Sequence, residues 1–410
     1  MVTYPADWEK VKLADLIIKG GSGGTPNTSK EEYYKGRIPF LSISDITNSN
    51  GYIYRTEKSI SELGLNSSAA WIVPSEALTL AMYASVGKVA ILKKDIATSQ
   101  AFYNMIFSSL GTRDFVYYYL KKFDRDNLWN PLISTGTQAN LNAKKIRNLE
   151  IYLPPLPEQQ AIAATLSYFD EHIDNLSELI EKKKAIRDGA LEDLVSGRTR
   201  LDGFNGEWKS ISFSQYFTLL PTNTYSREQL SDSGEIGNIH YGDVLIKYGC
   251  VLSQNDYIPR LIDTSKVTVK LYLNKNDVII ADTAEDETVG KAVQIGELNM
   301  PLISGLHTIA CRPNYQTAGG FLGYYINSNC YHDQLLPYIT GIKVSSISKK
   351  SIGETELYIP VDPKEQQAIA EVLTAMDEEI ESLETEKEKM IQIKEGAMDD
   401  LLTGRVRLKV

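Results

Sequence analysis

The stretch PEQQAIAATLSYFDEHIDNLSELIEKKKAIRDGALEDLVSGRTRL at residues 157–201 is repeated as KEQQAIAEVLTAMDEEIESLETEKEKMIQIKEGAMDDLLTGRVRL at residues 364–408. At a constant offset of 207, 22 of the 44 positions that begin at residue 158 are identical. Two unrelated surface helices of similar composition would share far fewer residues. A repeat of this kind decides the architecture, because each copy must be interpreted as the same structural unit.

Each copy has the pattern of one long helix. From Ile162 to Ile180, apolar residues follow one another at steps of 4, 3, 4, 3 and 4, which is the spacing of a coiled-coil seam. Pro157 suits the first turn of a helix, and Gly197 and Gly404 suit the position after the last turn. We therefore predict two long helices that pack on each other. The predicted seam residues are Ile162, Leu166, Phe169, Ile173, Leu176, Ile180, Leu194, Ile369, Leu373, Met376, Ile380, Leu383, Met390 and Leu401.

The segments before the two helices also correspond. Trp8 matches Trp208, VGKVAI at 86–91 matches VGKAVQ at 289–294, and FVYYYL at 115–120 matches FLGYYI at 321–326. Short apolar runs separated by Gly, Asn and Ser indicate strands, and helical stretches are expected near 112–126 and 318–336. The predicted fold class is α+β, with a pseudo-two-fold internal repeat. The expected domains are two β-rich α/β globules at 1–156 and 201–363, and two helices at 157–200 and 364–410.

Along the sequence, a globule and a helix are followed by a second globule and a second helix. The chain therefore resembles a closed ring of two equal halves that is opened at one point. The first helix continues into SGRTRLDGFNGEW, whereas the second ends in TGRVRL and would need the N-terminal DWEKVKL to continue. An antiparallel pair lets the second globule connect the helices without spanning about 60 Å, the length of one helix. We therefore expect antiparallel helices and neighbouring termini.

Full overlap of the two seams predicts that facing residues have numbers that add up to 563. In this register Ile180 meets Leu383, and Phe169 lies across from Lys394. We expect Gly396 to make room for the Phe169 ring and Gly189 to do the same for Met376. Glycine inside a helix costs about 1 kcal/mol, so a packing reason is plausible. We also expect a shifted start of the second helix at Lys364, the residue that stands before the second Glu-Gln-Gln.

The charge of the chain is concentrated in the helical repeats. The net charge is −10. Residues 158–201 carry 9 acidic and 6 basic residues, and residues 365–408 carry 12 and 5, so the helices account for all of it. Residues 1–157 carry 18 basic and 14 acidic residues. Acidic helices suit a protein–protein seam better than a DNA surface. If the chain binds DNA, other subunits supply much of the phosphate contact.

Composition also limits the cellular setting. The three cysteines, at 250, 311 and 330, show no CxxC spacing, which favours a reducing compartment and no zinc site. The start MVTYPADWEK lacks an apolar core, and no run of 18 apolar residues occurs. We expect a protein that is neither secreted nor membrane-spanning, with the cytoplasm as its location.

No catalytic pattern emerges from the sequence. NPLI at 130–133 lacks the second proline and the aromatic residue of an amino-methyltransferase loop, and GGSGG at 20–24 is more typical of a flexible loop than of a phosphate cradle. The four histidines have no metal-ligand spacing. The acidic cluster at 282–287 could hold a cation or accept hydrogen bonds from cytosine, although a solvated loop is the simpler interpretation. We predict no catalytic residue, no metal site and no cofactor in this chain.

The two helical repeats resemble the two central helical regions of type I restriction–modification specificity subunits. TGTQANLNAKKIRNLEIYLP at 135–154 and TGIKVSSISKKSIGETELYIP at 340–360 are similar to the ends of the target-recognition domains in that family. The resemblance implies a non-catalytic subunit whose two domains each recognise half of a bipartite DNA site. It further implies helices that space the domains and dock two methyltransferase subunits. Those subunits would bind S-adenosylmethionine, and added restriction subunits would use ATP and Mg²⁺.

Recognition of base edges needs hydrogen-bonding side chains on loops. Polar loop residues of both globules are therefore candidates, and Lys88 and Lys291 are the better candidates for phosphate contact. The predicted DNA-binding residues are Thr25, Thr28, Ser42, Tyr83, Ser85, Lys88, Ser99, Gln100, Thr137, Gln138, Thr222, Asn223, His240, Tyr241, Asp282, Thr283, Lys291, Ser304, His307 and Lys343. Two other functions stay open: a coiled-coil scaffold that carries two β-rich protein-binding modules, and a DNA-modifying enzyme with a divergent site.

Overall fold

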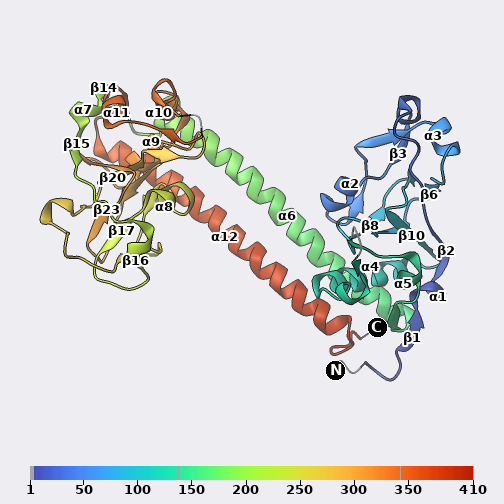
Figure 1. The fold of residues 1–410 in the computed structure, drawn as a ribbon. Helices are drawn as coiled ribbons and strands as arrows, with labels where there is room; N and C mark the ends of the chain where they lie inside the picture. Colours follow the sequence, from blue (N-terminus) through green and yellow to red (C-terminus); the bar gives the residue numbers. More distant parts are fainter. Residues whose placement is uncertain (1–3, 136–138, 342, 410) are drawn as a thin grey trace. The chain divides into compact units, whose positions relative to one another are not determined.

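The computed structural model describes residues 4–135, 139–341 and 343–409. The chain divides into two compact units, one formed by Met1–Leu176 with Glu386–Val410 and the other by Ser177–Thr385. Each unit contains a β-rich globule and one segment of each long helix, as the colours in Figure 1 show. The two candidates Thr137 and Gln138 lie outside the described residues.

The globule of unit 1 is built from short strands and one longer helix, α4. Its elements are β1 (Glu9–Lys12), α1 (Leu13–Leu16), β2 (Ile17–Ser22), β3 (Ile38–Phe40), α2 (Ile43–Thr47), β4 (Tyr52–Ile53), β5 (Lys58–Ile60), α3 (Glu62–Asn66), β6 (Ile72–Val73), β7 (Leu78–Ala81), β8 (Val89–Leu92), β9 (Ile96–Ala97), β10 (Phe102–Phe107), α4 (Leu110–Arg125), β11 (Ser134–Thr135), β12 (Ala139–Asn140), α5 (Ala143–Arg147) and β13 (Glu150–Leu153).

The globule of unit 2 repeats most of this order, without a counterpart of α3 and with some additional short elements. They are β14 (Trp208–Ser212), α7 (Phe213–Tyr216), β15 (Phe217–Leu220), β16 (Leu230–Ser231), β17 (Gly237–Ile239), α8 (Tyr241–Ile246), β18 (Val251–Leu252), β19 (Arg260–Leu261), β20 (Val278–Ala281), β21 (Thr283–Ala284), β22 (Ala292–Ile295), β23 (Leu302–Ser304), β24 (Thr308–Pro313), α9 (Phe321–Ile326), α10 (Asn329–His332), β25 (Ser345–Ser346), α11 (Lys349–Gly353) and β26 (Glu356–Pro360).

The five-stranded sheets of the two units have matching topology. A five-stranded sheet has the order β2-β10-β7-β8-β4 in unit 1 and β15-β24-β20-β22-β18 in unit 2. In both, the first strand of the globule pairs with its last strand, as β1 with β13 and β14 with β26. The fold is therefore α+β with an internal repeat, as the sequence predicts.

The central strands are apolar on both faces because both faces are covered. Every residue of β7, β8, β20 and β22 is buried. In unit 1, apolar residues of α4 and of both helix segments join one core cluster with the sheet. In unit 2, α9 and the other two helix segments do the same. Continuous apolar runs of four residues are the expected pattern for strands buried on two sides.

The long helices are α6 (Leu156–Val195) and α12 (Pro363–Leu401). Their first residues have the same offset of 207 as the sequence repeat. The expectation of a shifted start at Lys364 is therefore wrong, since this residue simply replaces Pro157 in the first turn. Gly197 and Gly404 follow the helix ends with φ of +72° and +70°, the left-handed conformation that glycine adopts most easily.

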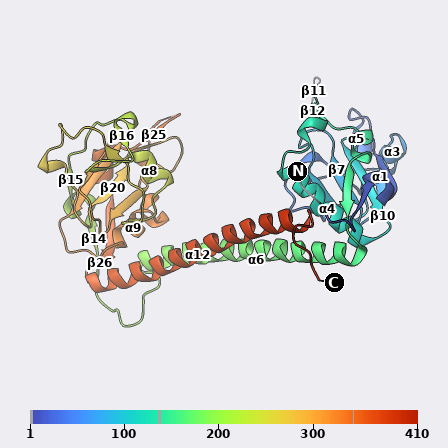
Figure 2. The same ribbon diagram turned by 90° about the horizontal axis from the view of Figure 1, so that it is seen from below.

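Cross-helix ion pairs show that the helix segments are antiparallel within each unit. In unit 2, Arg187 pairs with Asp377 at 2.8 Å and Lys183 pairs with Glu379 at 2.7 Å. In unit 1, Lys394 pairs with Asp170, and the segments lie side by side in both views (Figures 1 and 2). The residue numbers of these pairs add up to 564, 562 and 564, beside the predicted 563. Direct contact between Ile180 and Leu383 stays a prediction.

The predicted seam residues are all buried or half-buried. The suggested role of the helix glycines is wrong, however. A Cβ added at Gly189 or Gly396 would meet no other atom within 4 Å, because both glycines lie on the exposed face of their helix. They make no room for Phe169 or Met376.

Two other local expectations need correction. Gly20, Gly21 and Ser22 are not a flexible loop but belong to β2, which pairs with β10. The helical stretch expected at 318–336 is divided into α9 and α10, since Ser328 is extended and starts the second helix. By contrast, α4 lies within two residues of the stretch predicted at 112–126.

Candidate nucleic-acid interface

The loop between β7 and β8, residues 82–87, presents several candidates at one edge of the unit 1 sheet. The N–H of Ala81 donates to the Lys88 carbonyl at 2.8 Å, and the N–H of Gly87 donates to the Ala81 carbonyl at 3.0 Å. Gly87 has φ of +93°, and a Cβ there would lie 2.3 Å from the Trp129 ring. Ser85 also has a positive φ, a conformation of raised energy for this residue type. The two hydrogen bonds and the close approach of Trp129 therefore fix the backbone conformation of this turn.

Polar side chains converge on this loop. The Ser85 and Thr47 hydroxyls are 2.8 Å apart, and Tyr83 forms an antiparallel bridge with Asn140. The exposed Lys88 lies 3.1 Å from Asp124. A groove of about 490 Å³ beside it is lined by Lys88 together with residues of α4, α6 and α12. The loop thus combines hydroxyl groups with one partly neutralised cation.

The other candidates of unit 1 divide into exposed and internally bonded residues. Thr25 and Gln100 are exposed and bond to each other at 2.8 Å, and Thr28 is also exposed. Ser42 instead caps α2, where its hydroxyl is bonded to Asp45. Ser99 is buried. Ser42 and Ser99 therefore help to fold the chain.

In unit 2, the loop between β20 and β22, residues 282–290, occupies the equivalent position. Gly290 has φ of +96°, and its N–H donates to the Ala281 carbonyl at 2.9 Å, as Gly87 does to Ala81. This loop is three residues longer than its counterpart, as the paired glycines in the sequence show. It carries the acidic residues from Asp282 to Glu287. The same turn therefore supports a different set of side chains in each unit.

Five of the predicted residues come together beside the unit 2 loop. The Thr283 hydroxyl donates to Asp282 at 2.8 Å and lies 3.3 Å from Nδ1 of His307. The Tyr241 ring packs edge-on against His307 at 5.4 Å and contacts His240 at 4.6 Å. His307 is exposed and has φ of +57°. This cluster provides donors and acceptors on one small surface.

His240 is held as a neutral hydrogen-bond donor. Its Nδ1 accepts from the N–H of Gly242 at 3.1 Å and caps α8. Burial lowers the pKa of the imidazole, and the positive charge of Arg227 lowers it further. The neutral ring must therefore carry its proton on Nε2, a donor suited to an acceptor on a base edge.

The remaining candidates of unit 2 are mostly committed to internal contacts. Lys291 Nζ donates to the Leu245 carbonyl at the end of α8 at 2.9 Å, and burial lowers its pKa. Asn223 and Ser304 are buried and joined by a 2.7 Å hydrogen bond. Thr222 is half-buried and Lys343 is exposed. Lys88 and Lys291 occupy equivalent positions in the sequence, but Lys88 is exposed and Lys291 is half-buried.

A buried ionic contact attaches each globule to the ends of the helices. In unit 2, the glutamate that starts α12, Glu365, accepts from Trp208 Nε1 at 3.2 Å and from Arg200 at 2.8 and 2.6 Å. In unit 1, Glu158 accepts from Trp8 Nε1 at 3.3 Å and from Arg407 at 2.5 and 2.7 Å. Arg407, which follows α12, therefore contacts the glutamate at the start of α6 in the same way as Arg200, which follows α6, contacts the glutamate at the start of α12.

This contact also brings the two ends of the chain together. Arg407 forms hydrogen bonds of 3.0 and 2.8 Å with Asp7 and lowers the pKa of that carboxyl group. The expectation of neighbouring termini is confirmed.

A second repeated contact joins the globules to the helices halfway along each unit. The Tyr118 hydroxyl donates to Asp170 at 2.8 Å, and the Tyr324 hydroxyl donates to Asp377 at 2.7 Å. Each aspartate also pairs with a base on the other helix, Lys394 in unit 1 and Arg187 in unit 2. We call these two groups the Tyr–Asp clusters. The sequence analysis missed them, although the identical aspartates at the offset of 207 were a usable signal.

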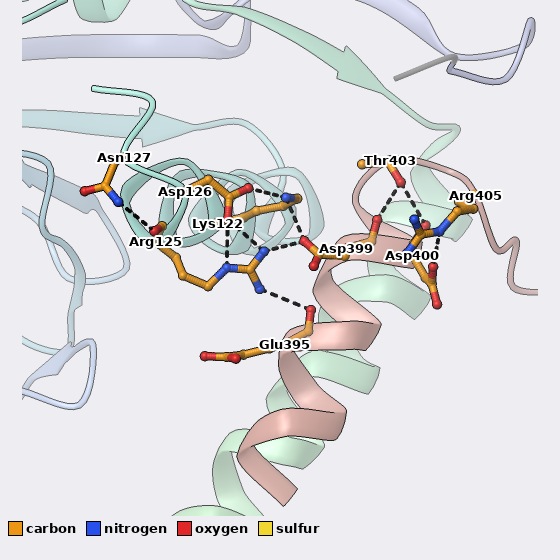
Figure 3. A network of polar contacts seen from close by, with 9 residues as sticks. All are labelled: Lys122, Arg125, Asp126, Asn127, Glu395, Asp399, Asp400, Thr403 and Arg405. Carbon is orange, nitrogen blue, oxygen red and sulfur yellow. Dashed lines mark hydrogen bonds and ion pairs between the residues drawn. The ribbon is translucent and has the colours of Figure 1, made fainter. Parts of the chain in front are cut away.

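Unit 1 has an additional polar network between the end of α4 and α12, shown in Figure 3. Lys122 lies 2.7 Å from Asp399, while Arg125 contacts Asp399 and donates to the Glu395 carbonyl at 3.1 Å. Burial by itself would raise the pKa of Asp399, but hydrogen bonds from Lys122 and Arg125 outweigh it and lower that pKa. The network fixes α4 against α12.

Within the described residues, no group of three or more His, Cys, Asp or Glu side chains could hold a metal ion. No helix in the described ranges has both the length and the apolar character that a membrane span requires.

Comparison with known proteins identifies the repeated unit. The family model of the type I restriction modification DNA specificity domain matches residues 5–184 and again residues 205–392. The chain belongs to this family. It is a specificity subunit with two target-recognition domains, and each match contains one globule and most of one long helix.

Individual specificity subunits agree with this assignment. The putative type I restriction enzyme MjaX specificity subunit of Methanocaldococcus jannaschii is 26% identical over 440 aligned residues, which cover 99% of this chain and 95% of that protein. The MjaIX specificity subunit of the same organism is 33% identical over 182 residues, 43% of this chain and 42% of that protein. The crystal structure of an S subunit from M. genitalium has the same fold, with a TM-score of 0.58 at 16% identity and coverage of 98% and 97%.

Proposed function

We propose that this specificity subunit is a non-catalytic DNA reader in which each globule recognises one half of a bipartite site. The observation that carries the proposal is the contrast between the two loops. The turn geometry and the attachment to the helices are repeated, whereas the side chains differ. Unit 1 has Tyr83 and Ser85 on its loop, and unit 2 has Asp282 and Thr283 on its loop with His307 beside it. A repeated backbone that carries different hydrogen-bonding side chains in each unit suits a DNA site whose two halves differ in sequence.

The helices space the two readers and dock two methyltransferase subunits. The repeated helix surfaces support two copies of one partner, and the acidic net charge of the helices suits a protein surface. The partner subunits supply S-adenosylmethionine for methylation, and added restriction subunits use ATP and Mg²⁺. Because its substrate is cellular DNA, the complex works in the cytoplasm.

Variants that should lose sequence recognition in only one half-site test this function. The complex with methyltransferase subunits is expressed in a host, and its methylated sequences are determined by methylome sequencing. His307→Ala should relax the sequence requirement in one half-site, and Tyr83→Ala should relax it in the other, because each removes contacts in one unit. An effect of both variants on the same half-site, or the absence of any bipartite methylated motif, would contradict the proposal.

The purified chain without partners tests the absence of catalysis. We expect no methyl transfer to DNA from the chain alone and full transfer after methyltransferase subunits are added. Methylation by the single chain would show that it is an enzyme. Partner binding without any preference for a DNA sequence would instead support the scaffold alternative.

A further inference from the structure

A groove of about 240 Å³ in the globule of unit 1 is surrounded by positive charge. Four exposed basic residues line it, and the exposed Tyr54 lies among them. None of the four forms an ion pair or a side-chain hydrogen bond within the described residues. The basic residues are Arg37, Arg55, Lys58 and Lys94.

Other lysines of the unit 1 globule are neutralised by carboxylates. Lys93, adjacent in sequence to Lys94, pairs with Glu76 at 3.0 Å, and Lys88 pairs with Asp124 at 3.1 Å. The carboxylate on the groove wall is that of Glu57, and it is already engaged by the Ser44 hydroxyl at 2.9 Å. The four positive charges therefore remain available to an external anion.

Three of these residues lie in strands or close to their starts, and Arg55 lies in the segment between β4 and β5. Arg37 comes directly before β3, and Lys58 is the first residue of β5, which is antiparallel to β3. Lys94 precedes β9, which is parallel to β3 with Phe40 opposite Ala97. Arg37 and Lys94 thus lie three residues before a matched pair on neighbouring strands. The paired strands therefore set the spacing of Arg37, Lys58 and Lys94.

Unit 2 lacks this arrangement at the equivalent strands. In that unit, β17 takes the place of β3. Glu235 stands five residues before His240, which caps α8, as Arg37 stands five residues before Ser42, which caps α2. The chain opposite β17 contains Pro259, which stands where Lys58 faces β3. The net charge of the two globular segments differs in the same direction. Residues 202–364 carry 13 basic and 18 acidic residues, whereas residues 1–157 carry 18 basic and 14 acidic residues.

We propose that this groove binds backbone phosphates of duplex DNA, so that unit 1 anchors the DNA more strongly than unit 2 does. The inference rests on the proposed function as a DNA reader. Arg and Lys side chains and a tyrosine hydroxyl are typical donors to phosphate. Such contacts contribute affinity and salt dependence but do not select a sequence. None of the four cations belongs to the loop at 82–87, so anchoring and base reading are separate functions of the globule.

The test is the salt dependence of DNA binding by the complex with methyltransferase subunits. Fluorescent duplexes carry either the methylated motif or a scrambled sequence. The variant Arg37→Ala/Arg55→Ala/Lys58→Ala/Lys94→Ala should bind both duplexes more weakly. The slope of log Kobs against log salt should fall by about 0.9 for each lost phosphate contact, or up to roughly 3.6 in total. The methylated motif should stay the same.

A matched variant removes the same number of positive charges from exposed positions outside the groove, namely Lys12, Lys35, Lys144 and Arg147. It should leave the slope nearly unchanged, and Lys58→Arg with Lys94→Arg should keep wild-type binding. Equal losses in both alanine variants, or an unchanged slope in the groove variant, would overturn the anchoring role. A wild-type complex without preference for the motif duplex would refute the reader function itself, which distinguishes the two failures. Unchanged thermal unfolding of both variants verifies that they are folded.

Discussion

At the scale of single residues, Asp377 connects three parts of unit 2. It accepts from Tyr324 of α9 and pairs with Arg187 of α6. The substitution Asp377→Asn should lower the free energy of unfolding by about 1–3 kcal/mol, because it leaves the partly buried guanidinium without its counter-charge. Urea unfolding measures the loss.

Asp188→Asn is the matched control for this prediction. Asp188 also contacts Arg187, at 3.2 Å, but its side chain is 70% exposed. Exposed ion pairs contribute under about 1 kcal/mol. Equal destabilisation by the two variants would show that the Tyr–Asp cluster adds nothing beyond surface charge.

Beside the Tyr–Asp cluster of unit 1 lies Lys121, 3.9 Å from Asp170, a lysine that should make stability depend on pH. Burial lowers the pKa of Lys121 to about 8, and Lys394 adds to the effect although Asp170 opposes it. In the unfolded chain the lysine titrates near 10.4. Between these values the unfolded state binds the extra proton, so stability should rise with pH by up to about 1.4 kcal/mol per unit.

The comparison of Lys121→Met with the wild type measures this contribution. Unfolding free energies between pH 7 and 10 should rise in the wild type and stay flatter in the variant. Lys88→Met, at an exposed lysine, should keep the wild-type profile. Identical profiles for the wild type and Lys121→Met would contradict the assignment.

Which polar residues face solvent could not be predicted from the sequence. Ser42 and Ser85 are both serines in polar loops, yet the first caps a helix and the second lies on an exposed turn. Likewise, His307 is exposed while Ser304, three residues earlier, is buried. The capping of α2 by Ser42 with Asp45 is a local pattern, but the Ser304 carbonyl accepts from Asn223, 81 residues away, and no local pattern encodes such a contact.

At the scale of elements, the long helices have a repeated exposed glycine without a packing role. Gly189→Ala and Gly396→Ala should each stabilise the isolated chain by about 1 kcal/mol, because alanine favours the helix and its Cβ meets nothing. Gly197→Ala should instead destabilise it, since φ is +72° there. Thermal unfolding distinguishes the two classes.

The same glycine variants also report on the outer face of the helices. If a methyltransferase subunit approaches closely at these positions, the alanine variants should gain stability as single chains but bind the partner more weakly. Loss of stability in Gly189→Ala or Gly396→Ala would show that the helix is strained at these sites, against the structure.

Long elements were predictable and short ones were not. The helices at 156–195 and 363–401 follow from sustained periodicity and terminal glycines. Strands of two residues, such as β4 and β18, exist only because a neighbouring strand pairs with them. The break between α9 and α10 depends on Ser328, whose hydroxyl bonds back to Tyr325, a local competition that periodicity does not reveal.

At the scale of the whole molecule, the repeat explains why residues 401–408 resemble residues 194–201 in the middle of the chain. The contact of Arg200 with Glu365 joins two consecutive halves, and the contact of Arg407 with Glu158 makes the same junction without a covalent link. The sequence predicted this closure because both copies were visible. The basic groove of unit 1 had no such signal, because its cations come from three separate segments that only the fold brings together.

The length of the helices should set the length of the unread spacer between the half-sites. Both helices pass from one unit into the other, near residues 176 and 386. An insertion of four residues in each, after Leu176 and after Glu386, adds about 6 Å of rise and disturbs the seam phase by only about 40°. With about 3.4 Å per base pair, the spacer should lengthen by at most about two base pairs.

Methylome sequencing of the insertion variant with its methyltransferase subunits gives the measurement. The half-site sequences should stay the same, because the insertion touches neither the loop at 82–87 nor the loop at 282–290. Four residues inserted instead between Asp202 and Gly203, in the exposed segment after α6, lengthen the chain without lengthening a helix and should leave the spacer unchanged. An altered half-site with an unchanged spacer in the helix variant would show that the spacing is not set by the helices.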